Sequence, residues 1–254
     1  MKPKKRYGQN FLKHPQILSK IVNFASCQDK NVLEIGPGQG DLTVQLCKVA
    51  KKVVSVEIDE SLDPFLFPIK ENYPNFNLIY CDFLKLDLEP YQNYVVVGNI
   101  PYNISSPIII KLVTSKIEDF TLLVQSEYAD RICGQPGTKN NSSFTALISY
   151  YGKCKKMMNV KNINFYPVPS VDSTLIKFER SRVYTEKDEH FLLFLKTCFS
   201  QKRKFLISNI NLIYNDKEKI INIFNNANIT TTIRAESLSI NDYINLYNLL
   251  YEHS

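Results

Sequence analysis

Short apolar runs rich in β-branched residues alternate with amphipathic stretches along the first half of the chain. Helical spacing of apolar residues occurs at Pro15–Ser26, from Asp41 onward, at Glu60–Asn72 and at Ser106–Ser115. The apolar runs predict strands at Asn31–Ile35, Lys52–Glu57, Leu78–Cys81, Tyr94–Gly98 and Phe120–Gln125. This alternation is typical of βαβ units around a parallel sheet. The sequence therefore predicts an α/β fold whose parallel strands end at a common edge.

The sequence changes character in its second half. Two more strands are predicted, at Lys155–Lys161 and Thr174–Glu179, and these could form an antiparallel edge. After Arg182 only helical periodicity remains, at Phe191–Phe199, Lys217–Asn226 and Ser239–Tyr251. Ser239 and Asp242 have the spacing of a capping box at the start of the last helix. We therefore expect two domains, residues 1–182 and a smaller, all-helical domain of residues 183–254.

Charge is distributed unevenly along the chain. The net charge of +6 comes from the first 20 residues, which carry six basic side chains and no acid. Two further basic clusters lie at Lys153–Lys161 and Lys202–Lys204. A neutral body with basic patches suits a partner with a phosphate backbone, although solvated surface lysines would give the same pattern.

Cysteine and histidine usage excludes several kinds of chemistry. No two of the six cysteines are closer than 20 residues, and the three histidines are scattered. The chain thus lacks zinc-ligand spacing, and we expect no metal and no Ser–His or Cys–His catalysis. The apolar runs are too short to span a bilayer, and no apolar segment follows the basic N-terminus. We therefore expect a cytoplasmic protein with reduced cysteines.

A glycine-rich loop and two acids follow successive predicted strands. The first strand runs into a loop with Gly36, Gly38 and Gly40, and a helix begins directly after it. Glu57 ends the second strand, where it could accept hydrogen bonds from two ribose hydroxyls, and Asp82 follows the third, where it could accept from an adenine amine. The GxGxG spacing differs from the GxGxxG of dinucleotide sites. This combination favours S-adenosylmethionine over NAD as the ligand.

The fourth strand ends in Asn99-Ile100-Pro101-Tyr102. The exocyclic amine of adenine is a poor nucleophile because its lone pair is delocalised into the ring. The side-chain oxygen of Asn99 and the carbonyl of Ile100 could accept the two amine hydrogens and so localise that lone pair. Pro101 would fix the backbone, and Tyr102 would offer a stacking face to the base. The motif therefore indicates methylation of an adenine amine without a general base.

A series of motifs covers nearly the whole chain: Tyr7–Leu12, Glu34–Gly40, Glu57, Asp82, Asn99–Tyr102, Phe165–Ser173, Phe199–Lys204 and Arg234–Leu238. In these motifs the sequence resembles the ribosomal RNA adenine dimethyltransferase family. It most resembles the branch that converts two adjacent adenosines near the 3′ end of small-subunit rRNA to N6,N6-dimethyladenosine.

The resemblance implies a Rossmann-like S-adenosylmethionine-dependent methyltransferase domain followed by a helical RNA-binding domain. The target would be 16S rRNA in an immature 30S subunit, and the enzyme would act in ribosome biogenesis as a monomer. Tyr102 and Phe165 would stack on opposite faces of the target base, with Asn99 and Ile100 at its amine. The resemblance also implies cofactor contacts from Asn10, Leu12, Gly36, Gly38, Glu57, Asp82 and Asn99.

Two departures from the family pattern stand out. Ile100 occupies a position where this branch more often has leucine, and Asn141-Ser142-Ser143 stands where the family usually has Tyr-Gly-Arg, which removes a basic side chain. Three other functions stay open at this point. They are a 23S rRNA methyltransferase of the macrolide-resistance type, a non-catalytic ribosome-assembly factor, and a DNA adenine methyltransferase, which would usually carry Asp/Asn-Pro-Pro-Tyr. The Phe199–Lys204 run favours the small-subunit branch.

Overall fold

The computed structural model describes residue 4, residues 8–138 and residues 140–251. A seven-stranded sheet has the strand order β4-β3-β2-β5-β6-β9-β7. In chain order its strands are β2 (Asn31–Ile35), β3 (Lys52–Glu57), β4 (Phe76–Tyr80), β5 (Val95–Asn99), β6 (Asp119–Gln125), β7 (Gly152–Val160) and β9 (Ser173–Arg180). All seven predicted strands are present, with ends shifted by no more than a few residues.

The first five strands of the sheet run parallel. Strand β2 pairs with β3 on one side and with β5 on the other, so that Val32 lies opposite both Val53 and Val95. Strand β4 extends the sheet beyond β3, β6 extends it beyond β5, and β9 runs antiparallel to β6. The predicted α/β fold with an antiparallel edge is confirmed. The strand order reverses at β2, which is where open α/β sheets bind ligands.

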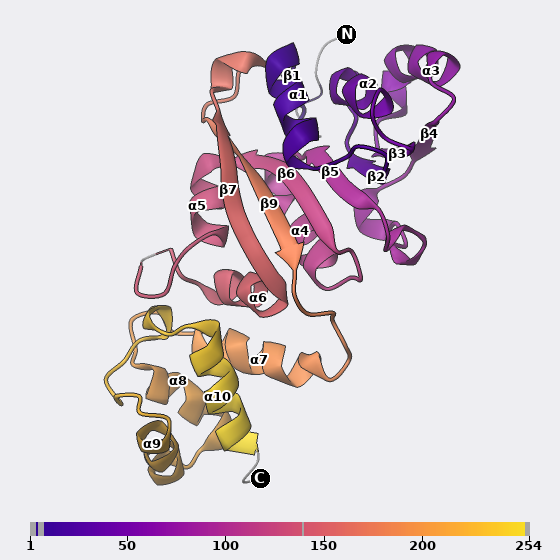
Figure 1. Cartoon of the computed structure of the whole chain (residues 1–254). Helices are drawn as coiled ribbons and strands as arrows, with labels where there is room; N and C mark the ends of the chain where they lie inside the picture. Colours follow the sequence, from indigo (N-terminus) through magenta and orange to yellow (C-terminus); the bar gives the residue numbers. More distant parts are fainter. Residues whose placement is uncertain (1–3, 5–7, 139, 252–254) are drawn as a thin grey trace. The chain divides into compact units, whose positions relative to one another are not determined.

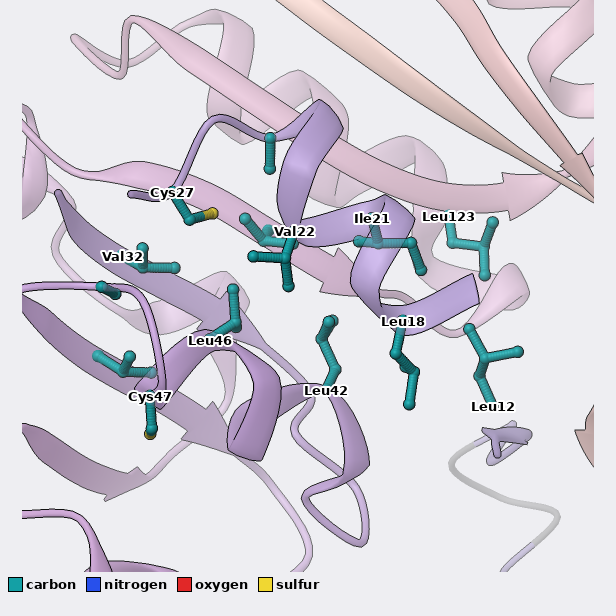
Figure 2. Packing of buried hydrophobic residues seen from close by; sticks show 14 of the residues in the cluster. Leu12, Leu18, Ile21, Val22, Cys27, Val32, Leu42, Leu46, Cys47 and Leu123 are labelled. Carbon is teal, nitrogen blue, oxygen red and sulfur yellow. The ribbon is translucent and has the colours of Figure 1, made fainter. Parts of the chain in front are cut away.

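Helices cover both faces of this sheet (Figure 1). On one face, α1 (Pro15–Phe24), α2 (Asp41–Cys47) and α3 (Asp63–Asn72) contribute to a single apolar cluster. Figure 2 shows Leu18, Ile21 and Val22 of α1 together with Leu42 and Leu46 of α2 among the buried residues of this cluster. Burial of these side chains, each worth about 1.5–3 kcal/mol, holds the helices on the sheet. Figure 1 draws α4 (Ser105–Val113) behind the sheet.

One carboxyl group lies inside this packing. Glu34 on β2 is 1% exposed and accepts hydrogen bonds from Thr43 Oγ1 at 2.8 Å and Ser55 Oγ at 2.5 Å. Burial raises the pKa of Glu34 to about 7, although these two hydrogen bonds act in the opposite direction and the charge of Glu57 adds to the rise. The folded chain therefore retains this proton where the unfolded chain, with a pKa near 4.5, has released it.

The sign of this shift predicts how stability depends on pH. The parent protein should lose stability as the pH rises from about 4.5 to about 7, by an amount on the order of 3 kcal/mol. Glu34→Gln cannot titrate, so its stability relative to the parent should increase over that range. Urea unfolding at pH 5 and pH 8 measures the difference, with the exposed Glu71→Gln as control. A Glu34→Gln difference that is independent of pH would contradict the pKa assignment.

The chain forms two compact units. One comprises the chain up to Ala129 together with Lys153–Val183, and the other comprises Asp130–Gly152 together with the chain from Tyr184. The chain last leaves the sheet unit after Val183, one residue from the expected boundary at 182/183, but residues 130–152 group with the C-terminal helices. The reason is the packing of helix α6 (Ser143–Tyr151). The Tyr150 hydroxyl donates to Asp188 at 2.8 Å, and the centroid of the Tyr150 ring lies 4.4 Å from that of Phe191.

The second unit is helical. Besides α6, it contains α7 (Asp188–Cys198), α8 (Leu206–Tyr214), α9 (Lys217–Asn226) and α10 (Ile240–Tyr251), and α5 (Ser126–Ile132) is divided between the two units. The predicted capping box precedes α10, where the Ser239 amide donates to Asp242 and the Asp242 amide to Ser239 Oγ. Helix α8 was not predicted, because its buried face carries a polar residue, Asn209, which donates to the Cys198 carbonyl at 2.6 Å.

Asn141-Ser142-Ser143, which departs from the family pattern, has a structural role in this unit. Asn141 is 8% exposed, and its amide donates to the carbonyls of Glu236 and Leu238 at 2.8 and 3.1 Å. Ser142 caps α6 by accepting from the Thr145 amide. The Arg234–Leu238 motif thus supplies the backbone carbonyls to which the Asn141 side chain is bound. Among the residues that the structure describes, no helix is long and apolar enough to cross a membrane.

Candidate active site

A cleft opens at the carboxyl ends of β2, β3, β4 and β5, where the strand order reverses. Nine of the ten predicted site residues line it, and the tenth, Phe165, does not appear among its described lining residues. The nine are Asn10, Leu12, Gly36, Gly38, Glu57, Asp82, Asn99, Ile100 and Tyr102. Residues far apart in sequence lie close together here because the carboxyl ends of parallel strands lie along the same edge of the sheet.

The loop after β2 approaches the cleft with its backbone. Gly36 and Gly38 have φ values of +67° and +58°, a left-handed conformation that favours glycine. A Cβ on Gly36 would meet nothing within 4 Å, so open space lies beside this residue. A Cβ on Gly38 would come within 2.9 Å of the Phe11 ring. The two glycines therefore have different functions. Gly36 leaves open space in the cleft, and Gly38 allows Phe11 of the N-terminal segment to pack closely against the loop.

Glu57 lies at the end of β3 and is 6% exposed. Its carboxylate accepts from the amides of Ile58 and Asp59 at 2.9 Å and from the Gly38 amide at 3.2 Å. Burial raises the pKa of Glu57, and these three hydrogen bonds limit the rise. The carboxylate is thus held rigidly in the cleft with acceptor capacity left for a ligand hydroxyl.

The lining of the cleft is acidic. Among its described residues are three acids, Asp41, Glu57 and Asp82, and no lysine or arginine. Asp41 is paired with Lys13 at 2.7 Å, whereas Asp82 follows β4 and accepts from the Leu84 amide. Such a lining disfavours a pyrophosphate and favours a ligand that carries hydroxyls, amines and positive charge. Among the described residues, no three His, Cys, Asp or Glu side chains gather to hold a metal ion.

The carboxyl end of β5 is packed closely against β2. A Cβ on Gly98 would come within 2.8 Å of the Ile35 carbonyl, so only glycine fits there. Ile100 is 1% exposed, and Asn99 is half-buried at the strand end. The Asn99 Nδ2 atom donates to the Asn10 carbonyl at 2.8 Å.

Tyr102 is fixed from a different part of the chain. Its hydroxyl lies 2.7 Å from Oγ of Ser173, the first residue of β9. Burial raises the pKa of Tyr102, and the hydrogen bond with Ser173 partly offsets the rise. Ser173 is fully buried, so this contact holds the hydroxyl end of Tyr102 in place, and Tyr102 lines the cleft.

Residues Gly8–Leu12, here named the N-terminal strap, cross the cleft. The strap ends in β1 (Phe11–Leu12), which pairs antiparallel with β8 (Phe165–Tyr166). At its other end Gln9 Nε2 donates to Asp59 at 2.9 Å, and Lys4 Nζ donates to the same carboxylate at 2.7 Å. Burial acts to raise the pKa of Asp59, but hydrogen bonds from Lys4, Ser61 and Gln9 outweigh it and hold the pKa at about 2. Tyr7, in the motif that begins the resemblance, lies outside the described residues.

Phe165 lies beside this cleft lining rather than in it. Its side chain is 3% exposed and packs in the apolar cluster, opposite Leu12 in the β1–β8 pair. The next residue, Tyr166, is 59% exposed. The structure therefore brings together the strap and the Phe165–Ser173 motif, but Phe165 is not among the described residues that line the cleft, and stacking by Phe165 stays a prediction.

Sequence reasoning missed two residues that organise the site, Asp59 and Ser173. Asp59 lies two positions beyond Glu57, and a buried acid whose partners Lys4 and Gln9 lie some 50 residues away has no local signal in the sequence. Ser173 ends the Phe165–Ser173 motif, whose presence together with the Asn99 motif could have suggested a contact.

The comparisons with known proteins agree with this geometry. The sequence model of the family described as "Ribosomal RNA adenine dimethylase" matches residues 1–252. The chain belongs to this family. Curated relatives named "Ribosomal RNA small subunit methyltransferase A" include one from Aster yellows witches'-broom phytoplasma, 41% identical over 94% of this chain and 93% of the relative. Another, from Fusobacterium nucleatum, is 40% identical over 96% of each chain.

Two solved structures have the same fold. A dimethyladenosine transferase from Plasmodium falciparum superimposes with a TM-score of 0.82 at 30% identity, covering 93% of this chain and 95% of that one. A 23S rRNA methyltransferase, ErmE, superimposes with a TM-score of 0.78 at 25% identity, covering 94% and 99%. The predicted Rossmann-like methyltransferase fold followed by C-terminal helices is confirmed.

The family's cofactor is S-adenosylmethionine, and the cleft fits it. The open space beside Gly36 can receive part of the cofactor. The rigid Glu57 carboxylate is an acceptor suited to ribose hydroxyls, and Asp82 is one suited to an adenine amine. The acidic lining is compatible with a sulfonium cation. When bound, the cofactor supplies an electrophilic methyl group.

Replacement of Glu57 tests the cofactor site. Glu57→Ala should raise the dissociation constant of S-adenosylmethionine at least about tenfold, because each charge-assisted hydrogen bond lost is worth about 1.5–3 kcal/mol. Isothermal titration calorimetry measures this, with unfolding curves in the absence of cofactor as a check on folding. The exposed acid Glu60 gives a matched control, and Glu60→Ala should bind normally. An unchanged affinity in Glu57→Ala would remove Glu57 from the site.

Proposed function

We propose that this protein transfers methyl groups from S-adenosylmethionine to N6 of two adjacent adenosines near the 3′ end of 16S rRNA, giving N6,N6-dimethyladenosine. The substrate is an immature 30S subunit, and the enzyme acts as a monomer in the cytoplasm during ribosome biogenesis. Membership of the ribosomal RNA adenine dimethylase family supports the reaction, and the small-subunit relatives at 40–41% identity support the choice of RNA.

The observation that carries the proposal is the position of Asn99 at the end of β5, in a cleft whose other strand ends present Glu57 and Asp82. The Asn99 oxygen and the Ile100 carbonyl accept the two hydrogens of the target amine and draw its lone pair out of conjugation with the ring. With the cofactor bound, that lone pair would attack the methyl carbon while the bond from this carbon to sulfur breaks and leaves its electron pair on sulfur. The methylated ammonium would then lose its proton to solvent because it is strongly acidic. Tyr102 stacks on the base that has left its helix.

Phe165 completes the base site in this proposal. Its ring lies directly across the β1–β8 pair from Leu12, which lines the cleft. A small movement of the Phe165–Ser173 segment when RNA binds would expose the ring to the second face of the base. The segment is suited to such contact, because Tyr166 and Val168 beside it are each 59% exposed.

Two alternatives receive less support. The 23S rRNA methyltransferase structure is only 25% identical, against 39–41% for small-subunit relatives that include one from Anoxybacillus flavithermus. A non-catalytic assembly factor would have no need of an assembled cleft with Asn99, Glu57 and Asp82 in its lining.

Basic residues of the second unit supply the RNA-binding surface in this proposal. Lys202, Arg203 and Lys204 lie in the loop between α7 and α8, and all three are exposed. An exposed run of three cations suits a phosphate backbone, where each contact releases a counterion. We therefore propose that the C-terminal helices bind rRNA.

Methyl transfer to ribosomal particles tests the function. The protein should transfer labelled methyl groups to 30S particles that lack the modification and leave 50S particles unmodified. Asn99→Ala should reduce the single-turnover rate on 30S particles by about 10²–10³, as expected for the loss of one preorganised hydrogen-bonding group. Cofactor affinity, measured in parallel, should change little. Transfer to 50S particles would favour the 23S alternative, and full activity of Asn99→Ala would remove this residue from the chemistry.

A salt titration tests the RNA-binding loop. Replacing Lys202, Arg203 and Lys204 by alanine should weaken binding to 30S particles and lower the slope of log K against log salt concentration by about 2–3. A triple alanine variant at the exposed lysines 48, 51 and 70 of the first unit is the matched control. An equal change in both variants would show that the loop has no special role.

A further inference from the structure

The side-chain amide of Asn99 faces a backbone carbonyl. Its Nδ2 atom lies 2.8 Å from the carbonyl oxygen of Asn10. A carbonyl oxygen can only accept a hydrogen bond, so only the NH₂ group of the amide can face it at this distance. The opposite orientation of the amide would place two acceptors in contact. Asn10 therefore fixes which end of the Asn99 amide points away from the strap, and that end is Oδ1.

Both partners of this hydrogen bond are held from outside. Asn99 is the last residue of β5 and pairs with Leu123 of β6. The strap is bound on one side of Asn10 by Gln9 and Asp59 and on the other side by the β1–β8 pair. The Asn10 side chain itself donates to the Gly8 carbonyl at 3.2 Å. The position of the carbonyl is thus set by the fold and not by the Asn99 side chain.

The orientation matters because an amide has a donor end and an acceptor end of nearly the same shape. A target amine carries hydrogens, so it needs the oxygen, and a rotated Asn99 would present NH₂ to NH₂. We propose that the Asn10 backbone carbonyl is a positioning group that keeps the Asn99 oxygen directed at the substrate amine. This inference deepens the proposed function and rests on the acceptor role of Asn99. It gives the strap a part in the methyl-transfer step as well as in cofactor binding.

An isosteric substitution separates acceptor from donor. Asn99→Asp keeps the acceptor oxygen and replaces the NH₂ donor by a second oxygen, and a carboxylate is a stronger acceptor than an amide. If only the acceptor mattered, this variant would be at least as active as the parent. With the Asn10 carbonyl in place, however, the carboxylate meets a second acceptor. We expect single-turnover rates at pH 8 and saturating cofactor to fall by about 10²–10³, as for the loss of a preorganised group.

The pH dependence of this variant reports on the missing donor. Once protonated, the carboxyl group that Asn99→Asp introduces can donate to the Asn10 carbonyl and still offer an oxygen to the amine. The rate of Asn99→Asp relative to the parent should therefore rise as the pH falls, about tenfold per unit until the carboxyl is protonated. Asp41, Glu57, Cys81, Asp82 and Tyr102 are the titratable groups around the same cleft, and dividing by the parent rate at each pH removes their shared effect.

Asn103→Asp is the matched control. Asn103 follows Tyr102, is exposed, and is absent from the described lining of the cleft. The substitution makes the same change of charge four residues from Asn99, and its rate relative to the parent should not vary with pH. A parallel rise in this control would attribute the effect to local charge and overturn the proposal.

Weakening the strap provides a second measurement that is independent of folding yield. Gln9→Ala removes the bond to Asp59, and in that background the Asn10 carbonyl is held less firmly. The penalty of Asn99→Asp at pH 8 should then be smaller than in the parent, by at least about threefold. Equal penalties in the two backgrounds would overturn the proposal, as would a relative rate of Asn99→Asp that is independent of pH. Both results leave the acceptor role itself intact, since that role is tested separately by Asn99→Ala.

Discussion

The parallel pairing of β2 with β3 on one side and β5 on the other is the constraint on which the site depends. After β2 the chain builds outward through β3 and β4, then returns and builds in the other direction from β5. The chain therefore leaves the strands on either side of β2 in opposite directions. The residues at and after the carboxyl ends of these strands surround a gap. Glu57 and Asn99 both line that gap because each ends a strand that flanks β2. No contact between the two residues is required to bring them there.

This dependence on strand ends explains what the sequence could predict. The position of Glu57, Asp82 or Asn99 follows from a local signal, an apolar run that stops at a polar residue. Topology does the rest for seven of the nine residues that line the cleft, whereas Asn10 and Leu12 were expected only from the family resemblance. Similarly, Ser239 and Asp242 form their capping box through contacts within one turn, and the sequence contains all the information that they need.

The features that sequence reasoning missed depend on partners far away along the chain. Strands β1 and β8 have two residues each, too few for a periodic pattern, and each exists only because the other is present. In so short a strand, adjacent side chains point to opposite faces, so a shift of one residue would exchange Phe165 and Tyr166. A motif can name the aromatic residue but cannot decide which of the two is buried.

The discontinuous second unit has a consequence for the order of events on the ribosome. Helix α6 leaves the exit tunnel before α7, yet the rings of Tyr150 and Tyr151 are covered by Phe191 and Tyr184 of the later segment. Strand β9, which completes the sheet beside β6, is also made before α7. The first unit can therefore close while α6 still carries an uncovered aromatic face. Truncation after residue 182 would make that transient state permanent, so isolating the sheet unit requires excision of residues 130–152 as well.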